Sequence, residues 1–284
     1  MGSVGSVVFV DLNESDPCYC YFPGRNCVFR VSKDCLVDFL RDCGVRVVFC
    51  EGSLMARVLS DFFDVYIVVS GQRGCREMLG LSKSHENDAR LLYLAWRSGY
   101  LRFHRFPRRL LPFDPLVYKY IVLCRERARA GFMVSKFKPR FFGDIREFYV
   151  DFRGWVDSLA RRLRDRITRR YRWVFDLVGV RGLGPYYIYF LMLIPELKYF
   201  SSKQRFLRYL GLKGVCKETD RGKRSYSVKA RTALRIAAER ANAYDLGLNE
   251  EPKKKPFRNW IKARKLAKKT YDVFKNYTRD NLSY

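Results

Sequence analysis

Acidic side chains are scarce in this sequence. Its 284 residues include 29 Asp and Glu against 56 Lys and Arg, which leaves a formal net charge of +27. A surplus of one sign repels itself, so such a chain usually meets a polyanion, either nucleic acid or an anionic membrane surface. A thermophilic surface would instead enrich both signs together. The charge therefore favours nucleic acid as the partner.

Long uncharged stretches are also missing, and we expect no membrane partner. No run approaches the roughly 18 apolar residues that span a bilayer, and the first residues do not resemble a signal peptide. We therefore expect a cytoplasmic, prokaryotic, nucleoid-associated protein with reduced thiols. The nine cysteines contain no Cys-x-x-Cys pair. Cys18, Cys20, Cys27 and Cys35 could form a zinc cluster, but buried thiols fit their spacing better.

Short apolar runs alternate with helical patterns over the first hundred residues. Expected helices cover residues 34–43, 54–63 and 85–96. A hairpin turn is expected at residues 23–26. The alternation predicts an α/β domain over residues 1–104, with a sheet covered by helices. The expected strands are Val7–Val10, Cys18–Phe22, Cys27–Val31, Arg46–Cys50 and Val65–Val69.

Helical periodicity and a high arginine content mark residues 105–173. Leu159, Leu163 and Ile167 fall on one face of a helix, and arginines fill the rest. This pattern predicts an Arg-rich helical linker, coiled coil or hairpin with an electropositive side. The arginines that we expect to contact nucleic acid are Arg161, Arg162, Arg166, Arg169 and Arg170.

The third part, residues 174–284, is predicted to be helical with a glycine-rich turn and a basic tail. Helices are expected at about 186–194, 203–209 and 230–243. We interpret the tail as a Lys-rich segment with scattered aromatic residues. The basic residues that we expect to contact nucleic acid in this part are Lys223, Arg224, Lys253, Lys254 and Lys255.

Carboxylates stand at the ends of two expected strands. Asp11 follows the first strand and Glu51 follows the fourth, while His85 and Asp88 share one face at the start of a helix. If these four side chains converge, they could hold two divalent cations, Mg²⁺ or Mn²⁺, against a phosphodiester. Each also has an ordinary explanation. Asp11 and Glu51 could be turn or cap residues, and Asp88 a surface charge in a helix's first turn.

These motifs resemble a known family. The first hundred residues are similar to the RuvC-like, ribonuclease-H-fold domain of DEDD-type transposases of insertion-sequence family one-ten, related to the pilin-gene inverting recombinase and the bridge-RNA-guided recombinases. The family's Lys-Thr-Asp-x-x-Asp-Ala helix corresponds to Lys-Ser-His-Glu-Asn-Asp-Ala at residues 83–89. His85 thus replaces the third acid. Some RuvC junction resolvases look similar there, so the resemblance still implies metal binding. Glu86 points off the shared face.

A second stretch resembles the same family's C-terminal domain. The turn that contains Gly182 and Gly184 is similar to a helix-hairpin-helix, whose backbone N–H groups face a phosphate. Residues 200–212 and 230–238 match the family's pattern in outline. The resemblance covers roughly residues 7–98 and 174–243. The Arg-rich middle resembles the family's coiled-coil linker in character only.

One departure concerns the nucleophile. The resemblance implies a serine, about eight residues after Gly-Leu, that links covalently to DNA. Thr219 is the best-placed hydroxyl here, with Ser225, Ser227 and Cys216 nearby. A threonine can attack, but its methyl group crowds an in-line approach. Alternatively, Thr219 is only a loop residue and the covalent step is lost.

The resemblance implies a DNA recombinase or transposase of a mobile element. Family members act as homodimers or homotetramers, and some are guided by a structured RNA encoded beside the transposase gene. Two alternatives stay open. One is a metal-dependent nuclease that cuts branched DNA by water attack, and the other is a decayed or domesticated transposase that only binds nucleic acid.

Overall fold

The chain forms two compact units, residues 1–108 and 109–284, in a computed structural model. The expected α/β plus helical class is confirmed at this level, because a mixed sheet forms the first unit and helices dominate the second. The predicted boundary at residue 104 lies close to the division between the units. The predicted boundary at 173 falls inside the second unit. The structure describes residues 7–12, 16–51, 54–68, 80–137, 139–212, 227–249 and 255–276.

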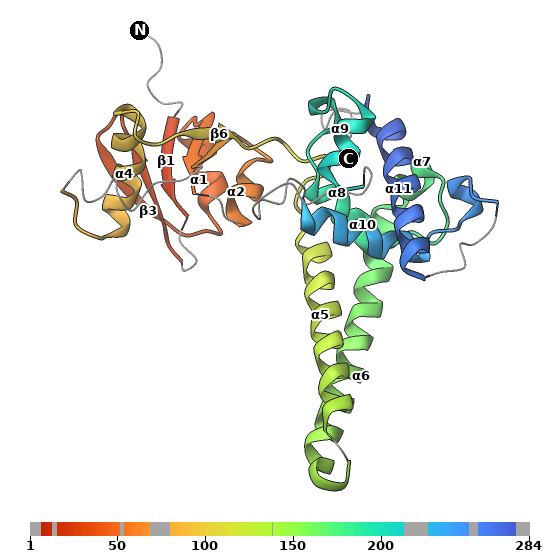
Figure 1. Cartoon of the computed structure of the whole chain (residues 1–284). Helices are drawn as coiled ribbons and strands as arrows, with labels where there is room; N and C mark the ends of the chain where they lie inside the picture. The colour runs from red at the N-terminus through yellow and green to blue at the C-terminus, as the bar shows by residue number, and fades with distance from the viewer. Residues whose placement is uncertain are drawn as a thin grey trace, which may run out of the picture. The chain divides into compact units, whose positions relative to one another are not determined.

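A six-stranded sheet forms the first unit, in the order β3-β2-β1-β4-β5-β6 (Figure 1). β1, β2 and β3 pair antiparallel, β4 and β5 run parallel to β1, and β6 pairs antiparallel with β5. The expected strands match closely, but β6 was missed because it has only three residues. The bounds are β1 Val7–Asp11, β2 Cys18–Phe22, β3 Cys27–Val31, β4 Val47–Cys50, β5 Asp64–Val68 and β6 Phe103–Arg105.

Helices cover both faces of this sheet. α1 (Leu36–Asp42) and α2 (Leu54–Leu59) pack on one face, and α4 (His85–Arg97) packs on the other. Under α4, the rings of Phe9 and Phe49 stack with their centroids 4.8 Å apart. Because side chains alternate along a strand, β1 and β4 contribute to both cores.

The second unit is almost entirely helical. α8 is apolar on every side and buried, and α5 and α10 pack against it while α11 packs on α10. Within the described residues, no helix combines the length and the apolar character that crossing a bilayer requires. The bounds are α5 Pro115–Lys136, α6 Pro139–Arg170, α7 Arg172–Val178, α8 Pro185–Leu193, η1 Leu197–Tyr199, α9 Lys203–Tyr209, α10 Val228–Arg240, η2 Tyr244–Leu246 and α11 Lys255–Phe274.

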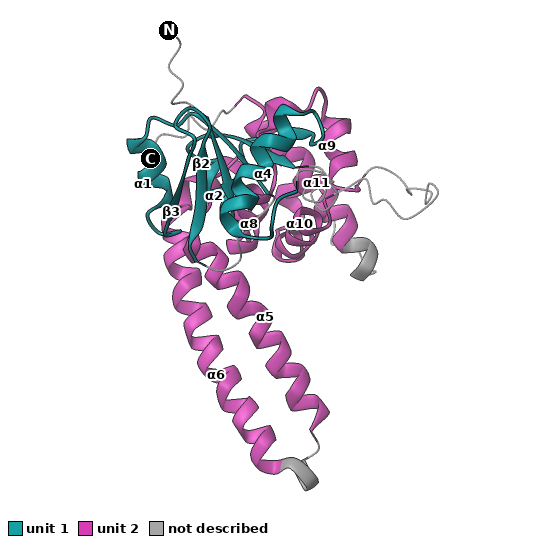
Figure 2. Ribbon diagram, turned by 90° about the vertical axis from the view of Figure 1, so that its left-hand side faces the viewer, with its two compact units in different colours: residues 1–108 teal, residues 109–284 magenta. Residues whose placement is uncertain are grey.

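The Arg-rich middle is a helical hairpin, in which α5 and α6 lie side by side (Figures 1 and 2). Hydrogen bonds to Asp114 hold its base together. The buried Asp114 carboxylate accepts hydrogen bonds from the Tyr171 hydroxyl and the Leu116 N–H, both at 2.8 Å. Tyr171 itself is buried between α6 and α7. The end of α6 and the start of α5 are therefore joined at the base of the hairpin.

The Lys-rich tail is more than a basic segment. Lys255–Phe274 form helix α11, on which Leu266, Tyr271 and Phe274 are buried. Even Lys262 is only 2% exposed. The many lysines concealed an apolar spacing of three and four residues, which is the pattern of an amphipathic helix. Lys253 and Lys254 lie outside the described residues.

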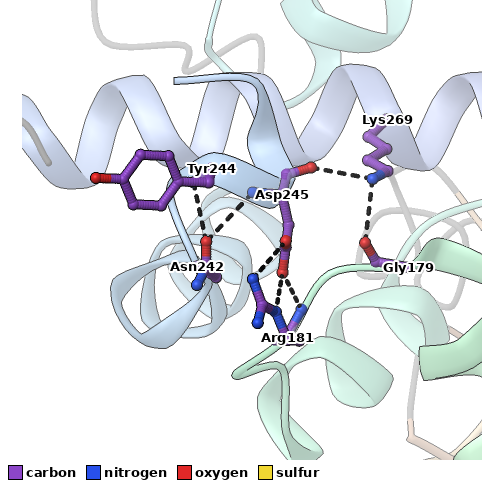
Figure 3. A network of polar contacts seen from close by, with 6 residues as sticks. All are labelled: Gly179, Arg181, Asn242, Tyr244, Asp245 and Lys269. Carbon is purple, nitrogen blue, oxygen red and sulfur yellow. Dashed lines mark hydrogen bonds and ion pairs between the residues drawn. The ribbon is translucent and has the colours of Figure 1, made fainter. Parts of the chain in front are cut away.

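The glycine-rich turn between α7 and α8 is held by a polar network (Figure 3). Arg181 donates from its backbone N–H and from Nε to one oxygen of Asp245, at 2.8 and 3.0 Å, and from Nη2 to the other at 3.1 Å. Lys269 on α11 donates to the carbonyl oxygens of Gly179 and Asp245. The Arg181 guanidinium lowers the pKa of Asp245. The turn is thus fixed to both η2 and α11.

Gly182 makes the closest backbone approach in this turn. Its φ is +82°, and a Cβ placed there would lie 2.0 Å from the Arg240 carbonyl oxygen at the end of α10. Gly184 has an extended φ of −151°, and an added Cβ would meet nothing within 4 Å. Glycine at 182 is therefore required by the protein's own backbone, whatever the turn binds.

We predict that Gly182→Ala destabilises the fold by roughly 3 kcal/mol or more, because it combines a left-handed φ with a backbone clash. Gly184→Ala is the matched control and should cost less than about 1 kcal/mol. Urea unfolding followed by circular dichroism measures both. Equal losses in the two variants would contradict the contact between the turn and α10.

Candidate metal centre and basic hollow

Two carboxylates leave the sheet at the same edge. β1 and β4 are parallel, with Val10 opposite Cys50, so Asp11 and Glu51 follow at their carboxyl ends. Ligands of α/β sheets bind at such an edge. Side chains alternate along each strand, so both residues continue the rows of Phe9 and Phe49 on the side of α4.

The first turn of α4 brings two more ligands to this edge. Ser84 caps the helix by accepting a hydrogen bond from the Asn87 N–H at 3.1 Å. The cap fixes where the helix starts, and His85 and Asp88 then lie on one face. His85 Nδ1 is 2.9 Å from Asp11 Oδ2, and its ring stacks on Tyr19 with centroids 5.5 Å apart.

Asp11, His85 and Asp88 form a group that could hold a metal ion. One ligand atom from each residue lies within 4.8 Å of the other two. Two ligands of one Mg²⁺ ion, each about 2.1 Å from it, are at most about 4.2 Å apart, so a small adjustment would suffice. Glu51 lies outside this group, yet it is near enough to act on Asp11 through its charge.

The electrostatics of this group favour a cation. Asp11 is only 7% exposed, and burial raises the pKa of its carboxyl group. The hydrogen bond from His85 lowers this pKa, while the nearby charges of Glu51 and Asp88 raise it further. A divalent cation would stabilise the ionised form of Asp11 at neutral pH, because it opposes both burial and like-charge repulsion.

The cysteines do not form a comparable site within the described part of the chain. The potential metal ligands that come together in the described residues are Asp11, His85 and Asp88 alone. Cys18 and Cys20 are buried, and burial raises the pKa of Cys18 to about 11. These two are therefore buried thiols, as the spacing predicted, whereas Cys27 is half-buried and Cys35 is exposed, against that prediction. Thr219, Ser225, Cys216, Lys223 and Arg224 lie outside the described residues.

A basic hollow adjoins the glycine-rich turn in the second unit. It encloses about 500 Å³ and is lined by Arg164, Asp165, Thr168 and Arg169 of α6, by Arg240 of α10, and by the turn from Gly182 to Pro185. The Asp165 carboxylate accepts a hydrogen bond from Nε of Arg164 at 3.2 Å. Gly184 is the N-cap of α8 and provides no side-chain cap. The hollow therefore combines guanidinium groups with a helix N-terminus, which is a suitable environment for a phosphate.

The predicted nucleic-acid-binding residues lie only partly at this hollow. Arg161, Arg162, Arg166, Arg169 and Arg170 are all exposed on α6, but of these five only Arg169 lines the hollow. Gly182 and Gly184 line it as well. Arg164 and Arg240 also line the hollow, although neither was among the predicted residues. Arg164 belongs to the predicted helical pattern, whereas Arg240 lies far from the turn in the sequence.

Comparisons with known proteins assign no family to the chain. No protein-family model matches it, and no curated protein matches it significantly. The side-chain chemistry of the two sites therefore carries the functional interpretation.

We predict that Asp11→Asn makes the metal-free protein more stable at pH 7, by on the order of 1 kcal/mol. With a raised pKa, Asp11 supports folding fully below pH 3.8, and this contribution is lost as the pH rises through the raised value. The amide removes the buried charge. Thermal unfolding in the presence of a chelator measures the gain.

The same variant should lose stabilisation by Mn²⁺. The wild type gains about 2.7 kcal/mol at a hundredfold excess over its dissociation constant. Asp38→Asn is the matched control, since the Asp38 side chain is 77% exposed on α1. It should respond to Mn²⁺ as the wild type does. Equal responses of Asp11→Asn and the wild type would contradict the metal centre.

Proposed function

We propose that this protein is a metal-dependent recombinase that cuts and rejoins DNA strands. The observation that carries the proposal is the convergence of Asp11, His85 and Asp88 at the carboxyl edge of a mixed sheet. Carboxylates grouped in this way hold the divalent cations that phosphodiester chemistry uses. The net charge of +27 and the basic hollow supply the affinity for the polyanionic substrate.

The sheet topology supports the finer assignment of a ribonuclease-H-type, RuvC-like domain. Three antiparallel strands are followed by two strands parallel to the first. The acid on β1 and the acid after β4 lie beside each other across a parallel pair. This order is consistent with the fold that the resemblance to insertion-sequence family one-ten implies.

Within the metal centre, Asp11 and Asp88 would hold the cations, with Glu51 completing their shell. When bound, the cations would polarise the scissile phosphate and lower the pKa of the attacking hydroxyl. His85 contributes a neutral nitrogen where the family has an acid. A nitrogen ligand suits Mn²⁺ better than Mg²⁺, so we expect Mn²⁺ to bind more tightly.

One of the candidate nucleophiles already has a structural role as a helix cap. The Ser227 hydroxyl accepts a hydrogen bond from the Ala230 N–H at 3.4 Å and caps α10. This structural role favours Thr219 or Ser225 as the attacking hydroxyl. The covalent intermediate belongs to the proposal through the resemblance to the family.

The basic hollow and the arginines of α6 would hold nucleic acid by its phosphates. Contacts of this kind position a strand without reading its sequence. They would serve equally for DNA and for the structured guide RNA that the resemblance implies. A homodimer or homotetramer, the other partner that it implies, would present several such surfaces.

A second candidate is a nuclease that cuts branched DNA with water as the nucleophile. The metal centre favours it, since Asp11, His85 and Asp88 come together without any contribution from Thr219. Both candidates predict strand cleavage, and they differ in whether the protein becomes attached to the DNA.

We predict that Asp11→Ala abolishes Mn²⁺-dependent cleavage of branched DNA while leaving DNA affinity within about threefold of the wild type. Asp38→Ala is the control and should cleave normally. A denaturing gel separates the candidates. A covalent protein–DNA adduct lost in Thr219→Val supports the recombinase, whereas free nicked strands support the nuclease. Undiminished cleavage by Asp11→Ala would overturn both, and intact DNA with the wild type would indicate a binding protein.

We also predict that Arg164→Ala combined with Arg240→Ala weakens DNA binding by about tenfold or more at physiological salt. The slope of log affinity against log salt concentration should fall by about 1 to 2. Arg172→Ala is the control, because its side chain is 82% exposed on α7 and does not line the hollow. Fluorescence anisotropy measures both quantities. A double variant that binds like the control would contradict a role for the hollow.

A further inference from the structure

A smaller hollow adjoins the basic hollow at the glycine-rich turn. It encloses about 210 Å³ and is lined by residues of α5, α8, α10 and the turn, all in the second unit. The two hollows share four lining residues, namely Gly182, Gly184, Pro185 and Arg240. A ligand that enters one hollow is therefore within reach of the other.

The smaller hollow has a different chemistry from the basic one. The exposed side chains of its lining are charged, and they are Arg127, Glu239 and Arg240. The buried and half-buried side chains of its lining are mostly aromatic or apolar, and they are Tyr120, Cys124, Pro185, Tyr186, Ile236 and Ala237. A ligand that fits such a hollow has apolar faces and a polar edge.

Two tyrosine rings contribute to this lining. The centroids of Tyr120 and Tyr186 are 6.1 Å apart, and their planes are inclined by 74°. Because the rings meet edge to face, they do not cover each other as a stacked pair would, and a planar ligand can stack on one of them. Each ring also carries a hydroxyl group, which can donate or accept a hydrogen bond at the ligand's edge.

The volume of the smaller hollow suits a single ring system. Sites for drug-sized ligands commonly enclose about 300–1,000 Å³, and this hollow is smaller. A nucleobase is planar, and its edge carries hydrogen-bond donors and acceptors. The adjoining basic hollow offers guanidinium groups and the N-terminus of α8 to a phosphate. The two hollows together therefore match the two ends of one nucleotide.

A base inside a regular duplex could not enter the smaller hollow. It is paired and stacked on both faces, and it would have to be turned out of the helix first. The cost of doing so is lowest for a base that is already unpaired. The geometry therefore favours a strand with an unpaired nucleotide, such as a bulge, over a continuous duplex.

We propose that the smaller hollow is a base pocket, which receives one unpaired nucleobase stacked on Tyr186 while the basic hollow holds the neighbouring phosphate. The inference rests on the proposed function only where the basic hollow binds nucleic acid, and it does not depend on the metal centre. Stacking is tolerant of base identity because every base has a π-face. We therefore expect the pocket to accept more than one kind of base.

Two duplexes with equal numbers of phosphates test the base pocket. One has a single bulged nucleotide, and the other has an abasic residue at the bulged position, each made both as DNA and as RNA. The wild type should bind the bulged base about tenfold more tightly than the abasic bulge, a factor that stacking on one aromatic side chain can supply. The strand type that shows this difference is the one that supplies the base. Fluorescence anisotropy without divalent cations measures the affinities and prevents cleavage.

Variants of Tyr186 assign the difference to the pocket. Tyr186→Leu should abolish the preference for the bulged base, whereas Tyr186→Phe keeps the ring and should retain most of it. Tyr244→Leu is the matched control, because Tyr244 is 67% exposed on η2 and lines neither hollow. Arg164→Ala should weaken binding of both duplexes equally, since Arg164 lines only the basic hollow. Circular dichroism checks that each variant keeps the wild-type helix content.

Photocrosslinking locates the base in the unmodified protein. A 5-iodouracil at the bulge should crosslink to the peptide that contains Tyr120 or Tyr186. Equal affinity of the wild type for the bulged and the abasic duplexes, in DNA and in RNA, overturns the base pocket and leaves the proposed function intact. A preference that survives in Tyr186→Leu, or a crosslink elsewhere, also overturns it. A wild type that binds none of the duplexes overturns the base pocket and the nucleic-acid part of the proposed function together.

Discussion

The Asp11 carboxylate sits at the end of β1, where only 7% of the residue is exposed. Burial and the charges of Glu51 and Asp88 all disfavour its ionised form, and only His85 opposes them. Hydrophobic packing of Phe9 and Phe49 beneath α4 holds these groups together regardless. The grouping of these carboxylates thus lowers the stability of the unit, and a bound cation would restore part of it. A loss of stability of this kind is usual at a functional site.

The chain has three surfaces of different charge, which its net charge alone does not reveal. Acids gather at one sheet edge in the first unit. Arginines cover the basal half of α6 and the hollow beside the glycine-rich turn in the second. The distal part of the α5–α6 hairpin, residues 131–160, is nearly neutral and aromatic. The three surfaces differ in charge and in the side chains that they present. A net charge alone would have predicted only the second of these.

Local patterns in the sequence were enough to predict five of the six strands of the first unit. Buried strands appear as apolar runs, and the parallel register then brings Asp11 and Glu51 to one edge without further information. Contacts between distant residues could not be predicted. Arg240 reaches Gly182 only through the packing of α10, so the close approach of that glycine was assigned to a phosphate rather than to a carbonyl oxygen. The lysines of α11 similarly concealed its buried face.

The contact between His85 and Asp11 decides how the metal centre would respond to protons. Its Nδ1 lies 2.9 Å from Asp11 Oδ2, so a proton on that nitrogen would be donated to the carboxylate. The cation would then be ligated by Nε2, with Asp11 orienting the ring. Alternatively, Nδ1 would lose its proton and ligate directly. In both arrangements the imidazole must be neutral and Asp11 ionised, so binding of the cation releases protons and weakens as the pH falls.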